Sequence, residues 1–181
     1  MSKFVGQYES QAAVGKRRRR STVVWSFVAL SSFVWIFAIF LPPLAPVFGL
    51  PGIGDGAFSF FGHICHQIPD RSMHFLGHQL GVCSRCFGVY TGLLVGTLIY
   101  PLWREIESIE PLPRIWLFAS IVPLAIDWSL TMFGLWENTH LSRFLTGVIL
   151  GAGCVTFIIP ALVEIERNVS SRRRSDRGRQ Y

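Results

Sequence analysis

Four long apolar runs constrain this chain more than any other feature, because each is long enough to cross a lipid bilayer. They cover residues 23–41, 86–103, 115–133 and 144–163 of the 181-residue chain. An α-helix rises about 1.5 Å per residue, so about 20 apolar residues span the hydrocarbon core. Charged residues make up only 15% of the sequence, against about 25% in a soluble domain. The sequence therefore predicts an all-α polytopic membrane protein, folded as a four-transmembrane-helix bundle.

Basic residues at the two ends of the chain predict its orientation. Of the 17 lysines and arginines, six lie within 1–22 and six within 164–181. An even number of spans places both ends on one side, and the positive-inside rule makes that side the cytoplasm. We therefore expect a basic cytoplasmic tail at 1–22, a membrane domain at 23–163 and a basic, disordered cytoplasmic tail at 164–181.

The same tails predict which partners the chain contacts. Besides the lipid bilayer, we expect anionic lipid headgroups at the tails, because clustered Lys and Arg beside a span attract them. The net charge of +6 does not indicate nucleic-acid binding, since no folded basic surface accompanies the tails.

Glycines recur at every fourth position in two of the runs. Gly88, Gly92 and Gly96 lie in the second run, and Gly147 and Gly151 lie in the fourth. Small residues at this spacing let helix backbones approach closely in lipid. We therefore expect close helix packing within one bundle.

One window, residues 63–86, holds four of the five histidines and three of the four cysteines. It overlaps segment 57–82, which is too polar to span the membrane. Irregular backbone at that depth must be buried in protein, where its polar groups find partners. We expect this segment to form a short helical Cys/His-rich cap on the exoplasmic side.

The cysteines of this window have the spacing of metal ligands. Cys83 and Cys86 form a C-x-x-C at the start of the second run, and the pair Cys65-His66 lies upstream. Two sulfurs at this spacing, with further Cys or His ligands on a nearby segment, suit tetrahedral zinc. The predicted zinc ligands are Cys65, His66, Cys83 and Cys86. Alternatively, only one of the adjacent pair binds the metal, and the fourth ligand is His63, His74 or His78.

The third run contains an ionisable residue, Asp127. It lies about 18 Å along the helix from the cytoplasmic start, and so near the exoplasmic mouth. Ionisable residues within spans are costly to bury and are candidates for function. Arg71, Arg85 and Arg143 are assigned to the same end, and we expect one of them to pair with Asp127. These four are the predicted catalytic residues beneath the metal; the alternative is a structural ion pair between the third and fourth spans.

The window is compatible with three functions. The first is a zinc centre in an integral membrane protein, which is a metalloenzyme if the polar groups beneath the metal act on a substrate. The second is a membrane thiol–disulfide oxidoreductase using the Cys83–Cys86 pair, because exoplasmic thiols are readily oxidised and a helix N-terminus favours the thiolate. The third is a non-enzymatic scaffold with a structural metal or disulfide. Residue types alone do not separate an enzyme from a scaffold.

Several motifs resemble one known family. C-H-Q at 65–67, R-S at 71–72 and C-x-R-C-x-G-x-Y-x-G at 83–92 are similar to the family of prokaryotic membrane proteins called domain of unknown function 2085 (DUF2085). Asp127 and the later R-x-L-T-G at 143–147 also resemble it. The chain departs from the family at Trp128, where Gly is common, and at Ser142, where Leu is common. The resemblance implies a prokaryotic plasma or inner membrane, and it carries over no activity.

Overall fold

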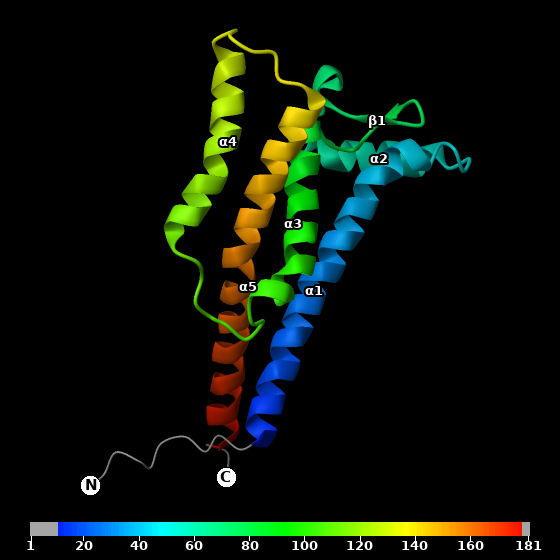
Figure 1. Cartoon of the computed structure of the whole chain (residues 1–181). Coiled ribbons are helices and arrows are strands. Elements are labelled where there is room, and N and C mark those ends of the chain that lie inside the picture. Colours follow the sequence, from blue (N-terminus) through cyan, green and yellow to red (C-terminus); the bar gives the residue numbers. More distant parts are fainter. Residues whose placement is uncertain (1–10, 179–181) are drawn as a thin grey trace.

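The structure is a computed structural model that describes residues 11–178 (Figure 1). Its five α-helices within that range are α1 (Gln11–Leu44), α2 (Pro51–Gly62), α3 (Ser84–Trp103), α4 (Arg114–Met132) and α5 (His140–Gly178). In the described chain, α1, α3, α4 and α5 are long and apolar enough to cross a membrane. The predicted all-α bundle with four spans is therefore confirmed.

The first and last helices extend further than the apolar runs predict. Helix α1 begins at Gln11, inside the predicted N-terminal tail. Helix α5 continues to Gly178, so residues 164–178, which we expected to be disordered, are helical. The reason is that residues 161–177 contain no Pro or Gly to break the helix. The remaining tail residues, 1–10 and 179–181, lie outside the described part.

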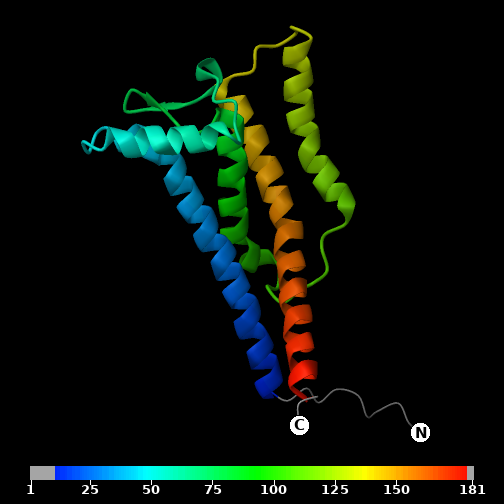
Figure 2. The same ribbon diagram turned by 180° about the vertical axis from the view of Figure 1, so that it is seen from behind.

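The two extended helices meet at one end of the bundle, where Figures 1 and 2 show the start of α1 beside the end of α5. The Arg20 guanidinium lies 3.3 Å from the Glu166 carboxylate, and it also donates a hydrogen bond to Ser170 Oγ. The described basic stretches of α1 and α5 are therefore on the same side, as an even number of spans requires. We call this side the basic end and the opposite side the cap end.

Helices α3 and α5 run parallel and make the most extensive contact in the bundle. Glycines allow this contact. A Cβ atom on Gly92 would lie 2.2 Å from the Val148 carbonyl oxygen, and one on Gly151 would lie 2.1 Å from that of Val89. The predicted glycine stripes thus face each other and bring two backbones together. Among the long helices of the described chain, α5 is the one that α4 packs against. Any contact of α4 with α1 or α3 is marginal.

The cap contains less helix than we expected. Helix α2 lies across the cap end, transverse to the long helices (Figure 1). It is followed by a 3-10 turn, η1 (Pro69–Arg71), and by strands β1 (His74–Phe75) and β2 (His78–Gln79), which pair antiparallel. Leu76 and Gly77, between the strands, both have positive φ, as in the tight turns that favour hairpins. The hairpin therefore replaces the helix expected in this part of the cap.

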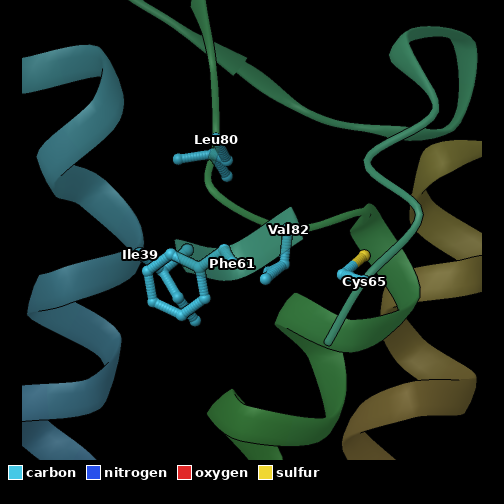
Figure 3. Close-up of a cluster of buried hydrophobic side chains, with 5 residues drawn as sticks. All are labelled: Ile39, Phe61, Cys65, Leu80 and Val82. Carbon is cyan, nitrogen blue, oxygen red and sulfur yellow. The ribbon is translucent and has the colours of Figure 1, made fainter. Parts of the chain in front are cut away.

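A small apolar cluster attaches the cap to the bundle (Figure 3). Ile39, Phe61, Leu80 and Val82 are almost fully buried, and Cys65 lies at the α3 side of the cluster. Pro43 lacks the N–H that would bond the Ile39 carbonyl in a regular helix, and the Gly81 N–H donates to that carbonyl instead, at 3.0 Å. The end of α1 therefore holds the chain segment that leads into α3.

Replacing Gly92 with Ala should destabilise the bundle, because the new Cβ would clash with a backbone carbonyl that cannot move aside. Overpacking of this kind costs about 1–3 kcal/mol. The matched control is Gly56→Ala in α2, where nothing lies within 4 Å of the added Cβ. Thermal unfolding in detergent should show a lower midpoint for Gly92→Ala alone. Equal midpoints for the two variants would contradict the close α3–α5 contact.

Candidate metal centre

Three cysteines converge at the cap end. The sulfur atoms of Cys65, Cys83 and Cys86 all lie within 4.8 Å of one another. Cys65 follows the end of α2, Cys83 immediately precedes α3, and Cys86 lies in the first turn of α3. Residues from two segments of the chain thus form one group of sulfur atoms that could hold a metal ion. All four cysteines of the chain are free thiols, and Cys154, in the middle of α5, is outside this group.

The turn after Cys65 is fixed by Gln67, a residue to which the sequence analysis gave no role. Gln67 has a positive φ of 48°. Its side-chain amide donates to the carbonyls of Phe58 at 2.7 Å and Gly81 at 2.8 Å. The Gln79 side chain in turn donates to the Gln67 carbonyl at 2.7 Å. These bonds tie the end of α2 to the segment just before Cys83, and so hold Cys65 near the start of α3.

The surroundings of Cys65 favour its thiolate. Burial of its side chain opposes the charged form, but the Cys83 N–H donates a hydrogen bond to its sulfur at 3.2 Å. Hydrogen bonds from the Cys83 and Cys86 thiols, together with that N–H, hold the pKa of the Cys65 thiol below its ordinary value. The N-terminus of α3 acts in the same direction, because the helix dipole is positive there. A thiolate is the form that binds metals.

The structure does not bring His66 into the sulfur group. Only the three cysteines have their ligand atoms close enough together among the described residues. The His66 side chain is exposed and lines the adjacent cavity. His63 lies against the Ser59 carbonyl at 3.0 Å, and His74 and His78 are exposed on the hairpin. Of the Cys65-His66 pair only Cys65 joins the sulfur group, and none of the alternative ligands His63, His74 and His78 joins it.

A cavity of about 470 Å³ opens beside the cysteines. Its polar lining includes all three predicted arginines together with one amide: Arg71 from η1, Arg85 from α3, Asn138 from the α4–α5 connection, and Arg143 from α5. Apolar side chains of the cap and of α4 complete the wall: Ile64, Ile68, Trp128 and Met132. The cavity therefore combines thiols, cations and apolar surface.

Asp127 pairs with Arg85, one of the three partners that the sequence allowed. The Arg85 Nη2 to Asp127 Oδ2 distance is 2.6 Å, and the side chains are 23% and 8% exposed. Asn138, which the sequence analysis did not select, donates from Nδ2 to the same Oδ2 at 2.9 Å. Arg143 Nε donates to Asn138 Oδ1 at 2.7 Å. One connected network thus links α3, α4 and α5 beside the sulfur group.

The four predicted catalytic residues therefore occupy different positions. Arg71, Arg85 and Arg143 line the cavity, whereas Asp127 does not. Asp127 instead forms the ion pair with the Arg85 guanidinium.

Replacing Asp127 with Asn should destabilise the cap end of the bundle, because Arg85 would lose its anionic partner. Hydrogen bonds to charged groups contribute about 1.5–3 kcal/mol, and we expect a loss in that range. Glu137→Gln in the exposed α4–α5 connection is the control. The unfolding midpoint in detergent should fall for Asp127→Asn and stay unchanged for the control. An unaltered midpoint for both would show that the ion pair contributes no stability.

Comparison with known proteins places the chain in a family. Residues 65–157 match the family model described as "Predicted membrane protein (DUF2085)". An uncharacterised protein of Methanocaldococcus jannaschii is 35% identical over 144 residues, which cover 76% of this chain and 92% of that protein. An uncharacterised protein of Methanothermobacter thermautotrophicus is 34% identical over 95 residues, covering 51% of this chain and 82% of the relative. No solved structure matches the chain. The chain thus belongs to the DUF2085 family of predicted membrane proteins.

Proposed function

We propose that this protein binds a zinc ion through Cys65, Cys83 and Cys86. The supporting observation is that the three sulfur atoms lie within 4.8 Å of one another. Zn–S bonds of about 2.3 Å in tetrahedral geometry require sulfur atoms about 3.8 Å apart. The thiols therefore need to move by about 1 Å or less to bind the ion.

The fourth coordination position makes the centre a site for chemistry. Structural zinc sites have four protein ligands, whereas catalytic sites keep three and leave one position for water or substrate. Only three ligand atoms converge among the described residues, and Cys65, Cys83 and Cys86 all line the cavity. We therefore infer a membrane metalloenzyme rather than a scaffold. A zinc ion bound there would supply a Lewis acid and lower the pKa of a bound water.

The residues around the centre keep its geometry. Gln67 fixes the turn that presents Cys65. Arg85 lies between the two cysteines of the C-x-x-C, and its ion pair with Asp127 fixes α4 against the start of α3. Outer groups of this kind typically change metal affinity 10- to 100-fold when they are lost. We assign Gln67, Arg85 and Asp127 to positioning of the centre.

A thiol–disulfide oxidoreductase is the second candidate function, because three free thiols within 4.8 Å of one another are also able to exchange disulfides. In that case, the purified protein would contain no metal, and its thiols would be oxidised and reduced in cycles with a quinone or a thiol partner. Metal content separates the two functions.

We further propose that the protein lies in a prokaryotic plasma membrane, with the basic end in the cytoplasm and the cap end outside. Arginines are concentrated at the basic end, and the positive-inside rule assigns such an end to the cytoplasm.

Protein purified in a neutral detergent should contain about one equivalent of zinc, measured by elemental mass spectrometry. The double variant Cys83→Ser/Cys86→Ser should contain almost none, because two of three ligands are lost. Cys154→Ser is the matched control, since this cysteine lies outside the sulfur group. His66→Ala should also retain the zinc.

Two results would contradict this proposal. Metal-free wild-type protein whose thiols undergo redox cycles would favour the oxidoreductase. Zinc that is lost in His66→Ala but retained in Cys154→Ser would make His66 the fourth ligand, and the centre would then be closed and structural.

The orientation is tested by two single-cysteine additions at exposed positions, His78→Cys in the hairpin and Ser171→Cys in α5. A membrane-impermeant thiol reagent added to intact cells should label His78→Cys above the wild-type level. Ser171→Cys should be labelled only after the membrane is permeabilised. The reverse pattern would invert the proposed orientation.

A further inference from the structure

We propose that the cavity beside the three cysteines binds a phosphoryl oxyanion, held by Arg71 and Arg143 next to the open metal position. This inference rests on the proposed zinc centre and names the class of ligand that the centre receives. Three features of the structure support it: the arginines that line the cavity, the direction of α3 and α5, and the apolar side chains of the cavity wall.

The three arginines of the cavity differ in how many of their N–H donors already have partners. Arg85 is engaged by Asp127. Arg143 uses Nε for Asn138 and Nη1 for a long contact of 3.4 Å with the Asp70 carbonyl. The Arg71 guanidinium has no hydrogen-bond or ion-pair partner anywhere in residues 11–178, although it lines the cavity. Arg71 and Arg143 thus have donors available for a ligand.

The charges around the cavity leave one positive charge uncompensated. Three guanidiniums contribute three positive charges and Asp127 contributes one negative charge. Three thiolates around Zn²⁺ contribute a net charge of minus one, because metal ligands are deprotonated. The remaining positive charge matches a monoanion such as a phosphodiester or monobasic phosphate.

The directions of α3 and α5 also favour an anion in the cavity. Helices α3 and α5 both begin at the cap end, at Ser84 and His140. Each helix N-terminus carries a partial positive charge that favours anions within about one turn. Arg85 and Arg143 lie in these first turns, so the two dipoles and the side-chain cations act on the same space.

The geometry favours a phosphoryl group over a planar carboxylate. Arg71 and Arg143 belong to different elements, η1 and α5, and the sulfur group lies on α3 and the cap. A tetrahedral oxyanion can present separate oxygens to two guanidiniums and to a metal. Arginine is well suited to such contacts, because its fork of N–H donors matches phosphate oxygens.

The apolar wall indicates two possible sources of this group. Ile64, Ile68, Trp128 and Met132 line the cavity together with the arginines. Trp128 and Met132 are also exposed on α4, a candidate membrane span. A lipid headgroup could enter beside α4 with its chains in the bilayer, and a free phosphate could enter from the aqueous side.

The test uses the full-length, zinc-loaded protein in a neutral detergent. Calorimetric titration at pH 6, where phosphate is largely a monoanion, should show binding of inorganic phosphate and none of acetate. Native mass spectrometry should show whether phosphatidylglycerol binds in preference to diacylglycerol with the same chains. Arg71→Gln is the first variant, because loss of an unpartnered side chain should leave the fold intact. Arg143→Gln is the second, and Arg114→Gln at the start of α4 is the control.

We expect Arg71→Gln to weaken phosphoryl binding by about tenfold or more, since hydrogen bonds to charged groups are strong. Arg143→Gln should do the same, and Arg114→Gln should have no effect. Binding of inorganic phosphate would identify a soluble source, and binding of phosphatidylglycerol alone would identify a lipid.

The inference is overturned if neither probe binds, if acetate binds as tightly as phosphate, or if Arg71→Gln binds as tightly as the wild type. Zinc content is measured on the same samples. If the phosphoryl probes fail to bind while zinc is present, the phosphoryl site is disproved and the metal centre is not. If the protein contains no zinc, the metal centre itself is disproved.

Discussion

The backbone contact between α3 and α5 determines how the C-x-x-C at the start of α3 lies relative to the first turn of α5. At the top of this contact, a Cβ on Gly88 would lie 2.2 Å from the Phe144 carbonyl oxygen, and one on Gly147 would lie 2.4 Å from that of Arg85. The two helices are parallel, so their N-termini come together at the same level. The C-x-x-C at the start of α3 is thereby placed next to Arg143 in the first turn of α5. The two neighbouring helix N-termini both favour negative charge, such as that of a thiolate or a bound anion.

The ion pair between Arg85 and Asp127 extends this arrangement to α4. Helix α4 has little buried surface, and apart from its contact with α5 it depends on polar groups at the cap end. A charge is costly in a membrane unless it is paired, so Asp127 constrains where α4 lies relative to Arg85. Asn138 then connects the same carboxylate to Arg143. The cavity wall is thus positioned by the same interactions that satisfy the charges.

The sequence predicted the four spans and the grouping of the cysteines, but not the roles of the side-chain amides of Gln67 and Asn138. Apolar runs and a C-x-x-C are local patterns, so they identify α3, α4 and the cysteines Cys83 and Cys86 without knowledge of the fold. Gln67 lies in the C-H-Q motif, but no local pattern reveals its role or that of Asn138. Gln67 acts through contacts with Phe58 and Gly81, and Asn138 through contacts with Asp127 and Arg143. His66 was selected for its type and its adjacency to Cys65. Local sequence cannot reveal which of two adjacent side chains points inward, and the structure shows that it is Cys65.

The conformation of Gln67 shows how the cap can hold three thiols together. A left-handed conformation costs a residue with a side chain about 1–2 kcal/mol, and such strain persists only where the surroundings enforce it. Here three hydrogen bonds of 2.7–2.8 Å involve Gln67 and offset that cost. The sharp turn lets the chain reverse directly after Cys65, while Gly81 fits against Phe61 with no room for a Cβ. A regular helix through residues 63–82 would carry Cys65 away from α3. The irregular cap is therefore what brings Cys65 to the C-x-x-C.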